Sequence, residues 1–446
     1  MSARTARTIF SAALAAILLG AAAAPVEQAG RFDTYMLLRK EAAEAFSAGD
    51  VPAAESRLIE ALAIFPDAPW SYIRLARVQA AAGKTEEALE NTGRFAGMGG
   101  VLDIDSDPVL APLKALPGWR DVANIMLDNA RPIGEPVEVL RVSARPDWIG
   151  EGLVHDGKGG LLLSTVSGRT VARLRDGSVE VFLKADAETG ALFGMAVDRR
   201  RGLLWVGEAW GAGVPGGDGA ARTGLLKVSL ADGRILGRIA MPGAGEKRQF
   251  GDLAVSDDGA VYASDAFGGV WRLKNGSDAL ERLLAPGSIG SPQGLVVCPG
   301  GKALLVADYS SGLHRLDLET GDLTAVQGLM AGLAGTDGLV AAPAFRFTSR
   351  AASSGAFAVV ATQNGATPQR VVLLRINRGC SELEQAELVA ANQQGLDDLT
   401  HVAVDGTTAT FIGHARWEAR ARDLTLARPD PGPILVYSAP VPQPLW

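Results

Sequence analysis

The chain has 446 residues, of which 47% are hydrophobic and 21% charged, and its formal net charge is -7 at pH 7. This length exceeds the roughly 250 to 300 residues at which one hydrophobic core stops growing, so we expect at least two domains. The composition is that of folded soluble domains and excludes a disordered chain or a bundle of membrane helices. Because no basic cluster is interleaved with aromatic residues, nucleic acid is excluded as an expected partner.

Residues 1–24 have the order of a secretory signal peptide. Arg4 and Arg7 precede an apolar run over residues 9–20, and small residues follow at 21–24. We expect cleavage after Ala23 in preference to Ala24, since cleavage after Ala24 would leave Pro25 at the new N-terminus. Cleavage at either position makes the protein periplasmic or secreted. An uncleaved anchor is the alternative, but the run is shorter than the roughly 20 residues that span a bilayer. No later stretch is long and apolar enough, so we expect no membrane span after signal removal.

Residues 32–94 carry apolar side chains at helical spacing without strand alternation. Gly49 recurs as Gly83 and Ala54 recurs as Ala88, and both offsets are 34 residues. This period is that of tetratricopeptide repeats, in which Gly and Ala mark the tight turn and the close helix contact. The segment therefore resembles a short tetratricopeptide array.

A further apolar stretch at 108–127 is expected to cap the array, with Pro112 and Pro117 splitting it into short helices. The helical segment thus covers residues 30–130. It serves either as a groove for a protein partner or as a packing adaptor docked on the next domain, and the short array favours the adaptor.

Residues 135–446 change to short apolar runs separated by Asp-Gly and Gly-Gly turns, which is typical of all-β domains. A pattern of three runs recurs six times, at intervals of 42, 58, 42, 44 and 63 residues, and the shorter intervals match one four-stranded propeller blade. No helical pattern separates the strands, which excludes a parallel α/β fold. The first runs are Glu151–Val154, Phe193–Ala196, Gly251–Ala254, Gln293–Val296, Asp337–Val340 and Thr400–Ala403.

The sequence therefore predicts a six-bladed β-propeller behind an all-α segment. The last pass ends after its third strand, and residues 136–142 offer an alternating strand ahead of the first pass. We expect this early strand to be the outer strand of the sixth blade and to close the ring.

The two cysteines, Cys298 and Cys380, are too few for a disulfide scaffold or a zinc cluster. Both fall on adjacent blades. Export permits a disulfide between them, and two buried free thiols are equally compatible with the sequence.

The first strand of each blade lines the central channel, so the residues that open these strands converge at one end of it, the channel mouth. They are Glu151, Phe193, Gly251, Asp252, Gln293, Asp337 and Thr400. Loops between second and third strands open on the same face. They add the substrate-binding candidates Asp308, Asn364, Arg370 and Trp417, besides Phe193, and the outer positions Glu208, Trp210 and Asp265. Residues 211–219 form a glycine-rich loop that could act as a lid.

Carboxylates and an amide oxygen around one mouth suit a hard divalent cation, with calcium as the expected ion. Glu151, Gln293 and Asp337 are the candidate ligands, and Asp337 and Asp252 the candidate catalytic acid/base residues. The alternative is that these side chains only cap backbone N–H groups or form ion pairs at strand ends.

The blocks Glu151–Val154, Ser291–Leu295 and Thr336–Leu339 resemble the senescence-marker-protein, gluconolactonase and luciferin-regenerating family, over roughly residues 148–440. That resemblance implies a six-bladed propeller, a lactone hydrolase activity and one divalent ion in the channel, held at Glu151, Gln293 and Asp337. Family enzymes usually carry Asn at the positions of Gln293 and Gly251. A metal site here is therefore expected to be weakened or rebuilt around Asp252.

Two functions follow. The first is an exported, metal-dependent hydrolase of lactones or related esters, favoured by Glu151 and Asp337. The second is a non-catalytic scaffold in which the propeller binds a ligand or protein and the helical repeats hold a partner, favoured by Gly251 and Gln293. A strictosidine-synthase-like or arylesterase-like propeller would share the fold, but no separate motif indicates one.

Overall fold

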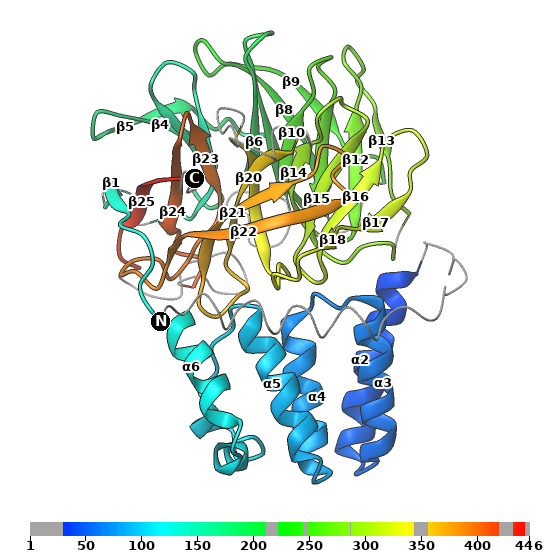
Figure 1. Ribbon diagram of the computed structural model, residues 1–446. Helices are drawn as coiled ribbons and strands as arrows, with labels where there is room; N and C mark the ends of the chain where they lie inside the picture. Colours follow the sequence, from blue (N-terminus) through cyan, green and yellow to red (C-terminus); the bar gives the residue numbers. More distant parts are fainter. Residues whose placement is uncertain are drawn as a thin grey trace.

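The computed structural model describes residues 30–143, 145, 147–210, 222–243, 248–285, 287–342, 356–418 and 431–441. The expected signal peptide and the glycine-rich loop at 211–219 lie outside these residues. Within them, a group of helices lies against one end of a ring of β-sheets (Figure 1).

The helical segment begins with two helical hairpins, α2 (Arg31–Ser47) with α3 (Val51–Ile64) and α4 (Pro69–Ala81) with α5 (Thr85–Gly97). The recurring glycines form the two hairpin turns, and each has the left-handed backbone that favours glycine, with φ of 81° at Gly49 and 77° at Gly83. Ala54 and Ala88 are fully buried where the helices meet. The 34-residue period therefore corresponds to a repeated helix–turn–helix unit.

The stretch that follows is a set of short helices, as predicted. It contains the 3₁₀ turns η2 (Ile104–Ser106) and η3 (Ala111–Ala115) and the helix α6 (Trp119–Asn129). Pro112 lies in the first turn of η3, and Pro117 lies between η3 and α6. Leu110 and Leu113 are fully buried against the core of the preceding helices, so this stretch covers the end of the array.

The rest of the chain is a six-bladed β-propeller. Each blade is an antiparallel sheet whose strands follow one another outward from the channel, and the fifth blade gains a short parallel strand at its edge. Blades one to three are β2 (Gly150–His155), β3 (Leu161–Thr165), β4 (Thr170–Arg175), β5 (Ser178–Leu183); β6 (Ala191–Asp198), β7 (Leu203–Trp210), β8 (Arg222–Ser229), β9 (Ile235–Ala240); and β10 (Phe250–Val255), β11 (Val261–Asp265), β12 (Gly269–Leu273), β13 (Leu280–Arg282). Blades four to six are β14 (Pro292–Val297), β15 (Ala303–Asp308), β16 (Gly312–Asp317), β17 (Leu323–Ala325); β19 (Thr336–Ala341), β20 (Phe357–Gln363), β21 (Arg370–Ile376), β22 (Glu382–Ala391) with β18 (Gln327–Gly328); and β23 (Val402–Asp405), β24 (Thr408–His414), β25 (Ile434–Pro440), β1 (Val137–Val142).

The ring closes as the sequence predicted. β1 pairs antiparallel with β25, so the strand that follows the helices becomes the outer strand of the sixth blade. The inner strand of that blade begins at Val402 instead of Thr400. The reason is that the residue before it is paired irregularly, with the Ile412 N–H donating to the His401 carbonyl outside the regular ladder.

The helical segment is docked directly on the loops of the channel-mouth face. Asp67, between α3 and α4, accepts hydrogen bonds from the backbone N–H groups of Gly332 (2.7 Å) and Leu333 (2.9 Å). Arg370 donates to the Met98 carbonyl at 3.1 Å, and the Val101 N–H donates to the Thr367 carbonyl at 2.8 Å. The helices therefore pack against the propeller through these hydrogen bonds.

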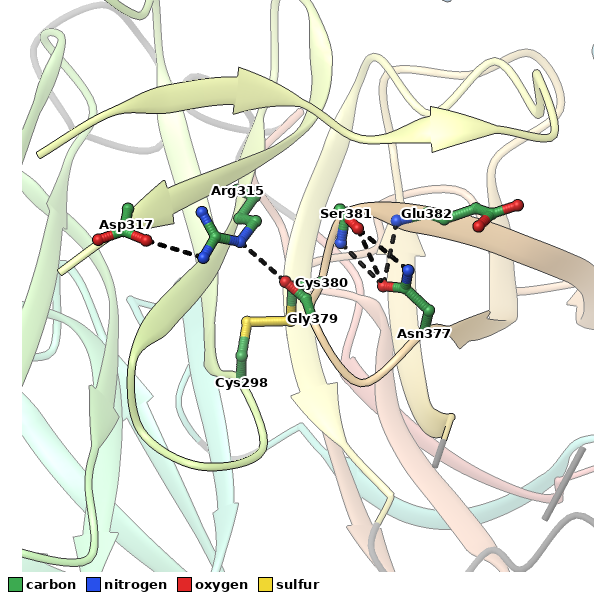
Figure 2. Close-up of a disulfide and its surroundings, with 8 residues drawn as sticks. All are labelled: Cys298, Arg315, Asp317, Asn377, Gly379, Cys380, Ser381 and Glu382. Carbon is green, nitrogen blue, oxygen red and sulfur yellow. Dashed lines mark hydrogen bonds and ion pairs between the residues drawn. A yellow bond between two sulfur atoms is a disulfide. The ribbon is translucent and has the colours of Figure 1, made fainter. Parts of the chain in front are cut away.

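Cys298 and Cys380 form a disulfide, with their Cα atoms 6.1 Å apart. Cys298 lies in the hairpin between β14 and β15, and Cys380 in the hairpin between β21 and β22, so the bond ties blade four to blade five (Figure 2). Arg315 adds a second link, because its Nε donates to the Gly379 carbonyl at 2.8 Å.

No helix in the described ranges combines the length and the apolar character that crossing a membrane requires.

Candidate functional site

Five inner strands carry a β-bulge at the end that opens the channel mouth. Register shifts interrupt the pairing between first and second strands in blades one to five. A bulge bends the strand and changes the direction of the side chains on it, and bulges are over-represented next to active sites. The bulged positions are those that the sequence pattern singled out, namely Glu151, Phe193, Gly251, Asp252, Gln293 and Asp337.

The recurring glycines of the first strands stand where neighbouring blades come into contact around the channel. A Cβ on Gly294 would lie 2.4 Å from the Leu339 Cβ, and one on Gly338 would lie 2.9 Å from the His401 Cα. The N–H groups in the bulges are satisfied by hydroxyls of the second strands. Ser164 accepts from the Gly152 N–H at 2.7 Å, and Thr362 accepts from the Gly338 N–H at 2.9 Å. The recurring glycine motif of the first strands therefore reflects close backbone packing at the channel.

Glu151, Asp252 and Asp337 are buried carboxyl groups in this ring, with relative exposures of 6%, 5% and 9%. None of them forms an ion pair with an arginine or lysine among the described residues. Glu151 accepts a hydrogen bond from the Trp417 Nε1 at 2.7 Å, and Asp337 accepts one from the Asn364 Nδ2, also at 2.7 Å. The channel therefore brings carboxyl groups together without a basic side chain that would neutralise them.

Burial and mutual repulsion shift the proton affinities of these groups. Burial raises the pKa of Asp337 to about 7, against the stabilising hydrogen bond from Asn364. Burial also raises the pKa of Glu151 well above its usual value, and the charge of Asp337 raises it further. Desolvation disfavours a charged carboxylate, and a like charge nearby does the same. The pair therefore holds a proton near neutral pH or requires a cation.

Asp252 is positioned differently from the other two carboxyls. Its Oδ1 accepts the Leu253 N–H at 2.7 Å, and the Nδ1 of His401 lies 3.7 Å from the same oxygen. Burial raises the pKa of Asp252 and lowers that of His401 to about 4, so the histidine is neutral at pH 7 and does not balance the carboxylate.

Gln293 and Gly251 fit each other sterically. A Cβ on Gly251 would lie 2.5 Å from the Gln293 Oε1, so the longer amide arm occupies the space that a side chain at Gly251 would fill. The Nε2 of Gln293 donates to the Ser291 Oγ at 3.0 Å. These two departures from the resembled family therefore belong to one local rearrangement.

The donor set fits a hard cation with few protein ligands. In the described ranges, no three His, Cys, Asp or Glu side chains lie together in an arrangement that could hold a metal ion. Two carboxylates with an amide oxygen are compatible with that result, and the Oδ1 of Asn364 is buried and lacks a hydrogen-bond partner. Carboxylate and amide oxygens supplemented by water are the ligands that calcium accepts. The candidate set is therefore Glu151, Asp337 and Asn364, whereas the Gln293 amide donates to the Ser291 hydroxyl.

Phe193, Asp308 and Arg370 were predicted to bind substrate, but they do not present a binding surface at the mouth. Phe193 is only 2% exposed and packs in an apolar cluster between blades. Asp308 is buried and accepts hydrogen bonds from the Ser291 N–H and the Ser311 hydroxyl. These groups are used inside the fold, which the sequence pattern of the propeller does not show.

The side chain of Arg370 is also used inside the fold. Its guanidinium donates to Gln363 Oε1 at 2.6 Å and to the carbonyls of Met98, Ala331 and Gly332. It is therefore an interface residue between helices and propeller. Asn364 and Trp417, by contrast, contact the carboxyl pair.

Two further residues belong to the site and were not singled out by sequence. Tyr309 is 38% exposed, and burial together with the charge of Asp337 raises its pKa to about 12. Asp398 is buried beside Trp417, and its charge raises the pKa of both Glu151 and Asp337. Tyr309 directly follows Asp308 in a loop already considered, so that loop position was a usable signal. Asp398 precedes the inner strand of blade six by several residues, and no sequence signal singled it out.

A sequence profile of the tetratricopeptide repeat matches residues 45–90. No curated protein sequence matches the chain. Among solved structures, virginiamycin B lyase from Staphylococcus aureus is similar at 12% identity and a TM-score of 0.41, covering 69% of this chain and 99% of its own. A streptogramin B lyase is similar at 14% identity and a TM-score of 0.41, covering 70% and 98%. A chain of a nidogen/laminin complex is similar at 14% identity and a TM-score of 0.38, covering 54% and 80%. At these identities and TM-scores, the similarity carries no inference about the activity of this chain.

Proposed function

We propose that this protein is an exported hydrolase of lactones or related esters that holds a divalent cation, calcium, at the channel mouth. The observation that carries the proposal is the buried pair Glu151 and Asp337, which lies in a ring of carboxyls with no arginine or lysine partner among the described residues. The resemblance to the senescence-marker-protein and gluconolactonase family supports the lactone substrate. The order of residues 1–24 supports export to the periplasm or exterior.

The residues of the site have separate roles in this proposal. Glu151, Asp337 and the Oδ1 of Asn364 would hold the ion. When bound, the ion polarises a carbonyl and lowers the pKa of bound water. Trp417 orients Glu151 through its indole N–H, and Asn364 orients Asp337. Tyr309 offers a hydroxyl to a bound substrate at the exposed side of the site.

Asp337 is the better candidate for proton transfer. Its pKa of about 7 allows it to accept and release a proton near neutral pH, which is the range in which a general acid/base is most effective. Asp252 is a weaker candidate, because its Oδ1 is bound to the Leu253 N–H and its site has a neutral histidine beside it.

The test combines metal analysis with turnover. Purified wild-type protein is analysed for bound calcium and assayed on γ- and δ-lactones and aryl esters, alongside Glu151→Gln. Glu208→Gln serves as the matched control, because Glu208 is equally buried but lies on blade two with its own partners Gly190 and Arg238. We expect calcium and turnover to be lost in Glu151→Gln and kept in the control. Absence of both metal and turnover in the wild type contradicts the hydrolase.

That last outcome favours a second function. The match to the tetratricopeptide repeat over residues 45–90 and the docking of the helices on the channel-mouth face support a scaffold that binds a protein partner. In that case the carboxyl ring would contribute to ligand recognition without catalysis.

A further inference from the structure

A cavity of about 410 Å³ opens between blades two and three. The helices lie at the opposite end of the propeller from the hairpins that contribute to this cavity (Figure 1). Its walls are mostly apolar and include Trp205, Leu236, Ile239 and Leu273. Lys227 also lines it and lies with its ammonium 5.9 Å from the centre of the Trp205 ring. A volume of this size and an apolar wall with few polar groups are typical of small-molecule sites.

The internal repeat of the propeller shows what is unusual about Lys227. The third strands of blades one, three and four carry an arginine at a matching place, shortly before the strand ends. Each of these arginines has a carboxylate partner: Arg173 with Asp156 at 3.4 Å, Arg272 with Glu281 at 2.8 Å and Arg315 with Asp317 at 2.9 Å. Lys227 has no carboxylate partner among the described residues.

The outer strand of blade two also differs from those of blades one and three. In blades one and three, a glutamate stands directly opposite the cation, Glu180 and Glu281. In blade two, Gly237 stands opposite Lys227, and a Cβ placed on it would meet nothing within 4 Å. Blade two therefore has open space beside Leu236, a residue of the cavity wall, where blades one and three carry a glutamate.

The other polar groups around the cavity leave the positive charge of Lys227 unbalanced. Arg201 is paired with Asp198 at 3.0 Å, and Lys274 with Glu281 at 2.7 Å. The indole Nε1 of Trp205 is buried and has no hydrogen-bond acceptor among the described residues. One wall thus carries a lysine without a carboxylate and an N–H donor without an acceptor, and unpaired buried polar groups cost stability unless a ligand or water satisfies them.

We propose that this inter-blade cavity binds a small organic anion with an apolar body and one anionic oxygen head, the head at Lys227 and the body against Leu236, Ile239 and Leu273. The site is distinct from the channel mouth, whose carboxyl ring repels anions. It does not depend on whether the mouth is catalytic.

The test is isothermal titration calorimetry on the full chain with octanoate as the probe. Octanol supplies the same apolar chain without the charge, and inorganic phosphate supplies the anion without the chain. We expect octanoate to bind about fivefold more tightly than octanol, since one favourable charge interaction at a partly exposed site contributes up to about this factor. We expect inorganic phosphate to bind more weakly than octanoate because it lacks the apolar chain.

Two variants test the location. Lys227→Met removes the charge, and Gly237→Glu installs the carboxylate that blades one and three carry, in space that is free for it. Both should weaken octanoate binding about fivefold, and Lys184→Met, an exposed lysine next to the outer strand of blade one, should leave it unchanged. Unchanged unfolding temperatures show that the variants fold.

The proposal is overturned if the wild type does not bind octanoate at millimolar concentration, or if octanol or phosphate binds as well as octanoate. It is also overturned if both Lys227→Met and Gly237→Glu bind octanoate like the wild type. Lys184→Met lowers the net charge by one, as both site variants do, so unchanged octanoate binding in Lys184→Met excludes a general effect of net charge.

Discussion

Replacing Asp337 by asparagine should stabilise the cation-free protein above neutral pH. The folded-state pKa of this carboxyl is about 7, against 3.8 for an unperturbed aspartate. The folded protein therefore binds this proton more tightly than the unfolded chain. The contribution of Asp337 to stability is fully present below pH 3.8, falls as pH rises from about 4 to about 7, and is lost above that range.

The magnitude follows from the same two pKa values. Their difference corresponds to at most about 4 kcal/mol of destabilisation at pH 8, at about 1.4 kcal/mol for each pKa unit. The amide that replaces the carboxyl would still accept the hydrogen bond from Asn364 and would carry no charge, so most of this destabilisation should disappear. We expect Asp337→Asn to raise the free energy of unfolding by about 2 to 4 kcal/mol at pH 8 and to change it little at pH 4.

The assay is urea unfolding in the presence of EGTA at pH 4, 6 and 8, followed by circular dichroism. Asp322→Asn, at an exposed aspartate in a hairpin of blade four, is the control and should not change the pH dependence. Equal stability of Asp337→Asn and wild type at pH 8 would refute the reasoning, because it would mean that the buried carboxylate is neutralised in the folded chain without a cation.

Three other predictions follow from the fold and the site. Calcium should raise the unfolding temperature of the wild type at pH 8 but hardly at pH 5, where the carboxyl pair is protonated, and Glu151→Gln should remove this shift. Differential scanning calorimetry with and without EGTA measures the shift. An equal shift at both pH values would contradict the site. The Cys298→Ser/Cys380→Ser variant should lose about 4 kcal/mol in urea unfolding, because the disulfide closes a loop with a sequence separation of 82, and a loss below about 1 kcal/mol would argue against that account. Gly294→Ala should lower the free energy of unfolding by more than about 3 kcal/mol, because its Cβ would lie 2.4 Å from the Leu339 Cβ. Gly237→Ala should change the free energy of unfolding by no more than about 0.5 kcal/mol. Similar losses for both variants would refute the packing argument.

The sequence predicted the propeller because its signals are local and repeated. Each blade repeats a glycine followed by an apolar run, and the glycines stand where first strands of neighbouring blades pack around the channel. The 34-residue period of the helices is equally local, since Gly49 and Gly83 form equivalent turns. The closing strand β1 was predictable because the last blade lacks a strand and an alternating segment precedes the first.

The candidate site was predicted only in part. Glu151 and Asp337 could be placed because they open inner strands, and Asn364 and Trp417 because they follow in loops on the same face. Arg370 met the same criteria, but its guanidinium binds backbone carbonyls at the helical interface. Which loops the helices cover depends on tertiary docking between segments far apart in the chain, and no local pattern encodes it.

The pairing of β1 with β25 makes the propeller depend on both ends of its own sequence. During synthesis the helices and β1 emerge first, and β1 has no partner until the final strand has been made. The sixth blade can therefore be completed only after β25 has been synthesised. A propeller cut off before β25, or released from the residues before β2, should accordingly stay an open ring that is prone to pair with a second copy.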